Sequence, residues 1–249
     1  ASVGGGIPII RPLCQCLAAN YIEGIAGILN GTTNFILTMM IEKGMSFDET
    51  LKIAQEKGYA EKDPTADVEG YDACRKGCIL ASLAFGKHVY PNQVETEGIT
   101  NITLEDVSYI ENAGGVIKLL GQIKYINDNE IAAFVSPAVV YNGSQLASVK
   151  DVFNAILVRG DAVGDVCFYG PGAGKLPTAS AVVADIIDCA KHSERKKIFG
   201  WGAGAEDYVV DYKERIEMPF YVRAKATPAE INAKFSDVKF LSRKGQPSE

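Results

Sequence analysis

The chain has 249 residues, of which 47% are hydrophobic and 22% are charged, and its formal net charge is −6. This composition predicts a soluble globular protein with one good core and room for a second small unit. The acidic balance disfavours nucleic acid or an anionic membrane as a partner, and no apolar run approaches membrane-spanning length.

The first third of the chain reads as one strand between helices. We expect, in order, a helix over residues 12–19, a strand over 21–29, and a helix from Thr32 or Thr33 to Lys43 that Gly44 ends. Ser46 and Glu49 fit the capping-box pattern and predict a further helix that ends near Lys57.

An acidic turn follows, in which residues 58–76 carry five carboxylates and lead into an almost wholly apolar segment over 77–85. That segment predicts a helix buried on all sides, with Lys76 at its edge. Asp72 precedes Lys76 by four residues and shares its helix face. Burial and the helix start favour a neutral amine at Lys76, whereas Asp67 and Asp72 favour an ammonium, a balance typical of a tuned acid or base. An ordinary exposed ion pair at the start of a helix, contributing ~0.5 kcal/mol, fits the spacing equally well.

The second half is richer in strands. A loop near Pro91 and a short helix over residues 104–112 precede predicted strands over 116–125, 131–141, 153–159 and 162–169, with turn signals at 127–129 and 142–143. Helices followed by a run of strands indicate an α+β fold in which the strands are antiparallel neighbours.

The last 54 or so residues differ in character. Residues 200–204 are glycine-rich and suggest a linker, and residues 220–226, 228–235 and 238–242 read as strand, helix and strand. This order resembles the opening of an ACT regulatory module that stops early, and an ordinary C-terminal extension is the alternative. We therefore divide the chain into residues 1–195 and a linker with an incomplete ACT-like segment over 196–249.

The six cysteines have apolar or helical surroundings and are interpreted as reduced, buried small hydrophobes, which suits the cytoplasm. Only two histidines are present, so no zinc-ligand spacing can be assembled. No secretory signal is visible, but an excised piece could have lost one, so the expected cytoplasmic location does not rest on this absence.

Residues 58–76 resemble the substrate-binding signature of homoserine dehydrogenases, Gly-Tyr-x-Glu-x-Asp-Pro-x-x-Asp-(Val or Leu)-x-Gly-x-Asp-x-x-(Arg)-Lys, with every fixed position present. Three more blocks, at residues 3–10, 27–37 and 170–182, are similar to other segments of that family. The resemblance implies a mixed, largely antiparallel sheet like the C-terminal half of glyceraldehyde-3-phosphate dehydrogenase. Helices would cover one face of this sheet, and the other face would form a homodimer.

The resemblance also implies an activity, the NAD- or NADP-dependent interconversion of L-homoserine and L-aspartate 4-semialdehyde on the route to threonine and methionine. Lys76 would be the acid/base, with Asp67 orienting it or a bound water. Glu61 would hold the substrate ammonium, and Asp72 would contact the substrate as a second carboxylate. Further substrate contacts are expected from Tyr59, Thr32 and Gly31. Thr32 fits an N-cap equally well.

Two glycine-rich segments suggest further ligands. Gly170, Gly172 and Gly174 resemble the family's loop over the cofactor, although glycines after a strand also suit a tight turn. The carbonyl oxygens of Val3, Gly5 and Ile7 match a monovalent cation site, usually for sodium.

The family places a Rossmann half before this region, whereas the chain opens without Met and no Gly-x-Gly-x-x-Gly follows an N-terminal strand. We expect an excised piece that holds the substrate site, binds the cofactor poorly and does not turn over alone. The preference between NAD and NADP stays open. A related semialdehyde reductase domain and an amino-acid-sensing binding module are the alternatives.

Overall fold

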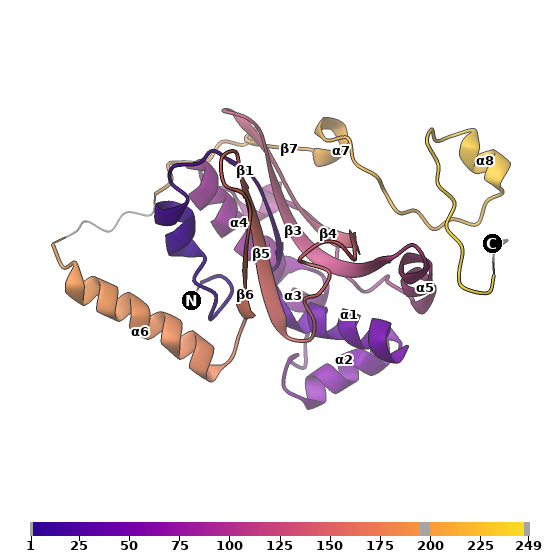
Figure 1. Ribbon diagram of the computed structural model, residues 1–249, viewed down its shortest axis with the longest axis horizontal. Helices are drawn as coiled ribbons and strands as arrows, with labels where there is room; N and C mark the ends of the chain where they lie inside the picture. The colour runs from indigo at the N-terminus through magenta and orange to yellow at the C-terminus, as the bar shows by residue number, and fades with distance from the viewer. Residues whose placement is uncertain (1, 195–199, 247–249) are drawn as a thin grey trace.

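The computed structural model describes residues 2–194 and 200–246, and its centre is one sheet (Figure 1). Seven strands are joined in the order β2-β4-β3-β1-β5-β6, with β7 paired to β4. Their bounds are Ile22–Ile28 (β1), Glu95–Thr96 (β2), Gly115–Asn127 (β3), Glu130–Tyr141 (β4), Phe153–Gly160 (β5), Gly164–Pro171 (β6) and Val209–Val210 (β7). The long pairs are antiparallel, and the short β2 and β7 pair with β4 in parallel. The predicted α+β class with a largely antiparallel sheet is confirmed.

Helices account for most of the remaining regular structure. They are the π-helix η1 (Pro12–Cys16), α1 (Gly31–Lys43), α2 (Phe47–Glu56), α3 (Thr65–Val68), α4 (Tyr71–Phe85), the 3-10 helix η2 (Pro91–Gln93), α5 (Leu104–Asn112), α6 (Lys175–Lys191), α7 (Tyr212–Arg215) and α8 (Pro228–Asn232). Ser46 and Glu49 form the predicted capping box of α2, and Gly44 ends α1 in the left-handed conformation that glycine adopts without strain. The helix predicted over 12–19 is confirmed only in part, because five of those residues, Pro12–Cys16, form helix and they do so as a π-helix.

The main core lies between the sheet and α1 and α4. Alternate residues of β3, such as Ile117 and Leu119, meet buried residues of both helices in one cluster. None of residues 77–85 in α4 is exposed, which confirms the prediction of an enclosed segment there. The core therefore fixes the first turns of α4 against the central strands.

The opposite face of the sheet is covered in parts. Ile28, Leu120 and Val140 form a smaller cluster with Leu146 and Val149 from the segment after β4. Further along β4, the ring of Tyr212 stacks on Phe134 with 3.9 Å between centroids. The C-terminal tail is thus attached to the sheet through β7 and Tyr212.

The tail does not have the predicted strands. Residues 220–226 and 238–242 have no strand structure, and the helix expected over 228–235 is limited to Pro228–Asn232. Phe220, Val222 and Phe240 are exposed. Apolar alternation forms a strand only where a neighbouring strand supplies hydrogen bonds, so these segments lack the predicted strands. The proposed boundary at residue 195 falls in 195–199, which lies outside the described residues.

Helix α6 extends along the outside of the body (Figure 1), and none of its residues is buried. Leu176 and Ile186 are among its exposed apolar side chains. Arg11 near η1 ties it to the body through an ion pair with Asp185 at 2.6 Å. This helix gains little stability from packing within the described residues.

The cysteine prediction needs a correction. Cys74 and Cys78 are buried in α4, but Cys14, Cys16, Cys167 and Cys189 are exposed, and all six are free thiols. Apolar neighbours in sequence did not bury these four, because their side chains lie on the outer faces of their elements. In the part of the chain that the structure describes, no helix is long and apolar enough to cross a membrane.

Candidate active site

The candidate site is built where β1 ends and α1 begins. Asn30 is the N-cap of α1, with an extended backbone and a side-chain oxygen that accepts a hydrogen bond from the Thr33 N–H at 2.9 Å. The alternative role of Thr32 as the N-cap was therefore wrong. The hydroxyl of Thr32 instead donates to the Tyr59 carbonyl oxygen at 2.7 Å, which ties the acidic turn to the start of α1.

Lys76 points inward from α4 toward this junction. Its Nζ donates to the Leu29 carbonyl oxygen at 2.9 Å and to Asp72 Oδ2 at 2.6 Å. The predicted shared face of Asp72 and Lys76 is confirmed, and the Lys76 side chain is only 22% exposed. An ammonium held by two oxygens at the end of a central strand is more ordered than an ordinary surface pair.

Two carboxylates meet beside this ammonium. The side-chain amide of Asn30 donates to Asp67 Oδ1 at 2.7 Å and to Asp72 Oδ2 at 2.9 Å. Burial raises the pKa of the Asp67 carboxyl and nearby Asp72 adds to this, whereas hydrogen bonds from Asn30 and Thr32 and the charge of Lys76 act in the other direction. The structure thus brings together the predicted residues Lys76, Asp67 and Asp72.

Sequence reasoning missed Asn30. It lies within the matched block 27–37, and an asparagine just before a helix is a common N-cap. That signal could have identified the cap. It could not have identified the contacts with the two carboxylates, which follow Asn30 by 37 and 42 residues.

The other predicted substrate residues lie along the turn before α3. Tyr59 packs edge-on against Phe35 with 5.1 Å between ring centroids and remains 44% exposed. The side chain of Glu61 is exposed, and its backbone carbonyl accepts from the Gln55 amide at 3.1 Å. The turn therefore presents both side chains at the surface, while Thr32 fixes its backbone.

The two predicted glycine loops pack against each other. The Gly6 N–H donates to the Pro171 carbonyl oxygen at 3.1 Å, and a Cβ atom at Gly5 would lie 2.3 Å from the carbonyl oxygen of Gly172. Of the three predicted cofactor glycines, only Gly174 has a positive φ, at 115°. A tight turn therefore explains Gly174 but not Gly172.

Asn154 connects the second loop to α1. A Cβ atom at Gly172 would lie 2.2 Å from the Asn154 Cγ, and one at Gly31 would lie 3.5 Å from the Asn154 Oδ1. The structure thus places the start of α1, the 170–174 loop and the 3–7 loop next to one another. The predicted residues Gly31, Gly172 and Gly5 belong to this junction.

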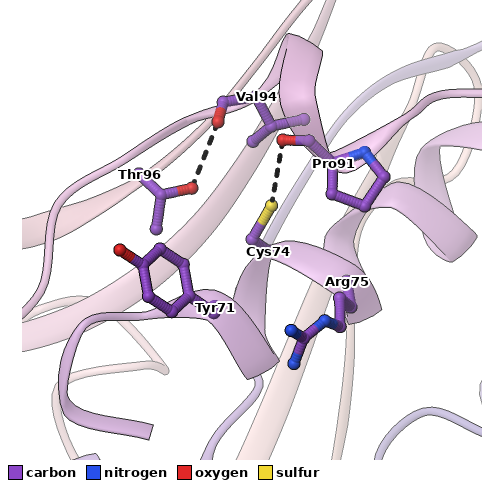
Figure 2. A pocket seen from close by; sticks show the side chains of 6 residues that line it. All are labelled: Tyr71, Cys74, Arg75, Pro91, Val94 and Thr96. Carbon is purple, nitrogen blue, oxygen red and sulfur yellow. Dashed lines mark hydrogen bonds between the residues drawn. The ribbon is translucent and has the colours of Figure 1, made fainter. Parts of the chain in front are cut away.

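A separate hollow of about 270 Å³ lies on another face of α4. Figure 2 shows its lining residues, which are Tyr71, Cys74, Arg75, Pro91, Val94 and Thr96. The Cys74 thiol donates to the Pro91 carbonyl oxygen there at 3.7 Å. This hollow includes none of the predicted catalytic side chains, so we do not assign the site to it.

Known proteins match the chain over most of its length. A family profile described as homoserine dehydrogenase matches residues 8–187. The homoserine dehydrogenase of Synechocystis is 51% identical over 191 residues, which are 76% of this chain and 44% of that protein. A homoserine dehydrogenase structure from Thiobacillus denitrificans has 46% identity and a TM-score of 0.75, and the match covers 84% of this chain and 49% of that one.

A more distant structure, a hyperthermophilic archaeal homoserine dehydrogenase in complex with NADPH, is 30% identical with a TM-score of 0.63. That match covers 76% of this chain and 54% of the archaeal chain. The chain thus spans a little under half the length of the curated relatives that it matches. With the profile match and these identities, the chain belongs to the homoserine dehydrogenase family.

Proposed function

We propose that this chain supplies the substrate-binding and acid/base part of an oxidoreductase that interconverts L-homoserine and L-aspartate 4-semialdehyde with NAD or NADP. The observation that carries the proposal is the position of the Lys76 ammonium, fixed between the Leu29 carbonyl and Asp72 within the family's signature segment. Family membership supports the same reaction. In biosynthesis the product would lead to threonine and methionine.

Lys76 performs the proton transfer in this proposal. When bound, the nicotinamide of the cofactor supplies a hydride to the aldehyde carbon or accepts one from the alcohol carbon. In reduction, the Lys76 ammonium gives a proton to the aldehyde oxygen of the semialdehyde. In oxidation, the neutral amine of Lys76 takes the hydroxyl proton of homoserine. Such a positioned group typically contributes ~10²- to 10⁴-fold to the rate.

Carboxylates bind and orient the substrate. Glu61, whose side chain is exposed, holds the substrate ammonium with its carboxylate. Asp72 contacts the substrate and keeps Lys76 in place, and Asp67 orients Lys76 or a bound water. The N–H groups at the start of α1, around Gly31 and Thr32, bind an anionic or carbonyl oxygen, and Tyr59 adds a hydroxyl contact.

The cofactor is proposed to contact the 170–174 loop. Asn154 Oδ1 is buried there without a hydrogen-bond partner among the described residues, so it can accept a hydrogen bond from a bound polar group. Gly170, Gly172 and Gly174 are the proposed contacts of this loop, and the missing Cβ of Gly172 lets the backbone lie directly against Asn154. The rest of the cofactor would be bound by the part of the relatives that lies outside the matched region, and the NADPH complex of the archaeal relative supports a nicotinamide cofactor.

A monovalent cation, sodium in particular, is proposed at the carbonyl oxygens of Val3, Gly5 and Ile7. Gly4 and Gly5 both have positive φ values, 72° and 52°, and turn the chain sharply there. The described residues contain no cluster of three or more His, Cys, Asp or Glu side chains that could hold a metal ion.

A homodimer is also proposed, through the face of the sheet that lies away from α1 and α4. Ala26, Ala138 and Leu157 on that face are only partly buried beside the smaller core cluster. We also retain residues 1–195 as the substrate-binding unit and 196–249 as a linker and C-terminal extension, without the strands expected of an ACT-like segment. The family match over residues 8–187 supports the first of these bounds.

Calorimetric titration tests the function. L-Homoserine should bind the chain at the acidic turn, and Glu61→Gln should weaken that binding. An amino-acid sensor would instead bind threonine or lysine tightly, and Lys76→Ala would leave its affinity unchanged. Oxidation of L-homoserine by a full-length protein carrying this chain completes the test, since absent turnover there would overturn the proposal. Faster turnover of a different aldehyde would favour a related semialdehyde reductase.

A further inference from the structure

We propose that Asn30 is a positioning residue for the reaction, because its side-chain amide holds Asp67 and Asp72 in place and thereby aims the Lys76 ammonium at the substrate oxygen. This inference rests on the proposed function. Asn30 is 5% exposed and lies between the central strand β1 and α1. It would act through the carboxylates rather than by touching the reacting atoms.

The orientation of the Asn30 amide is fixed by its partners. Its oxygen accepts from the backbone N–H of Thr33, which can only donate. Its nitrogen therefore faces Asp67 Oδ1 and Asp72 Oδ2, and ionised carboxylates can only accept. Exchanging the nitrogen and oxygen would leave all three contacts unsatisfied. A single orientation of the Asn30 amide therefore both caps α1 and donates to the two carboxylates.

One carboxylate oxygen connects Asn30 to Lys76. Asp72 Oδ2 accepts from the Asn30 amide at 2.9 Å and from the Lys76 Nζ at 2.6 Å. Lys76 also donates to the carbonyl of Leu29, the residue before Asn30. An ammonium has three N–H donors, and these contacts use two of them. The direction of the third, which would meet the substrate oxygen, is then set by the first two.

Asn30 also supports two neighbouring anions without adding a charge. The charged groups that face Asp67 are Asp72 and Lys76 from α4, and from α1 it meets the neutral side chains of Asn30 and Thr32. Asp72 raises the pKa of the Asp67 carboxyl, and the hydrogen bond from Asn30 lowers it. Without that amide, Asp67 would take up a proton more readily, and Asp72 Oδ2 would keep Lys76 but lose its hydrogen bond from Asn30.

Two substitutions separate this role from helix capping. Asn30→Ser keeps a good N-cap but removes the amide donor. Asn30→Asp keeps the cap and the size but places a third carboxylate against Asp67 and Asp72. The matched control is Asn34→Asp, one turn further along α1. Asn34 is also buried, but its amide donates to the carbonyls of Val149, Asp151 and Phe153, away from the acid pair.

The first measurement is the titration of Asp67 in this chain, followed by NMR of its side-chain carboxyl. We expect the pKa of Asp67 to rise in Asn30→Ser, to rise further in Asn30→Asp, and to stay unchanged in Asn34→Asp. Chemical denaturation of the same proteins records loss of stability separately. An unchanged Asp67 titration in Asn30→Ser would overturn the inference, and so would equal shifts in the Asn34→Asp control.

The second measurement uses a full-length homoserine dehydrogenase carrying this chain. Asn30→Ser should lower kcat by about 10- to 100-fold, because a misplaced catalytic group costs this much, and should leave the KM for the cofactor unchanged. A parent-like kcat in Asn30→Ser would also overturn the inference. Lys76→Met distinguishes the two failures, because full activity in that variant would refute the proposed function whatever Asn30 does.

Discussion

The Lys76 Nζ lies 2.9 Å from the Leu29 carbonyl oxygen, so the start of α4 is joined directly to the residue that follows β1. This contact turns the ammonium toward the junction with α1. A substituted side chain at residue 76 would have to reach the same oxygen to keep that position. The relationship sets the first test of mechanism.

In a full-length protein carrying this chain, Lys76→Met should lower the rate of homoserine oxidation by ~10²- to 10⁴-fold, because no amine would be present to accept the proton of the substrate hydroxyl. Steady-state kinetics measures this loss. Arg75→Met is the control, since Arg75 is the neighbouring cation on α4 but lines the separate hollow of Figure 2. Turnover of Lys76→Met within about tenfold of the parent, ~1.4 kcal/mol in the barrier, would exclude the acid/base role.

Glu61 and Asp72 should affect different kinetic constants. Glu61→Gln should raise the KM for homoserine by roughly 10- to 100-fold, as expected for the loss of a charge-assisted hydrogen bond, with a smaller change in kcat. Asp72→Asn should chiefly lower kcat, because it loosens Lys76. Asp63→Asn in the same turn is the control, since Asp63 accepts from the Thr65 hydroxyl. The reverse pattern would mean that the two roles are exchanged.

Lys118 should make stability depend on alkaline pH. It is buried, donates to Asn34 Oδ1 at 3.0 Å, and burial lowers its pKa to about 8. The unfolded chain binds this proton more tightly, so stability should rise as pH increases from about 8 toward 10.5, by roughly 3 kcal/mol at most.

Urea unfolding of the parent and of Lys118→Met across that pH range measures the effect. The variant should lack this part of the rise, so the difference between the two proteins should change with pH. Other groups titrate equally in both proteins and cancel in the difference. Parallel stability curves would show that Lys118 titrates alike in the folded and unfolded states.

Helix α6 should exchange its amide hydrogens faster than α1 in the isolated chain. None of its residues is buried, whereas most of α1 is, and a helix without tertiary packing is marginal in water. Hydrogen exchange followed by mass spectrometry compares the two helices directly. Arg11→Ala removes the ion pair to Asp185 and should speed exchange in α6 slightly, by the few tenths of a kcal/mol typical of exposed pairs. Equal protection of both helices would contradict the prediction.

Local signals predicted much of the fold. Short sequence patterns predicted the capping box at Ser46, the end of α1 at Gly44 and the long strands β3 and β4. The structure has all of these features. The strand prediction for the tail was wrong because the segment containing Phe220 and Val222 has no neighbouring strand to pair with. Sequence periodicity cannot reveal whether such a neighbour exists.

The candidate site was predictable only in part. The i,i+4 relation of Asp72 and Lys76 follows from helix geometry, so their pairing could be expected. Asn30 could not be connected to Asp67, because that contact depends on how α3 and α4 pack against the end of β1. The packing of Gly5 on Gly172 likewise joins residues that are distant in sequence.

The central place of β1 also has a consequence for how the protein is made. Residues 22–28 bond to β3 on one side and to β5 on the other, so their partners are synthesised about 100 and 130 residues later. Until residue 160 has left the ribosome, β1 can pair with β3 but lacks its second neighbour, β5. Such distant pairing slows folding, and a chaperone that shields exposed strand edges would be most useful to the nascent chain during this interval.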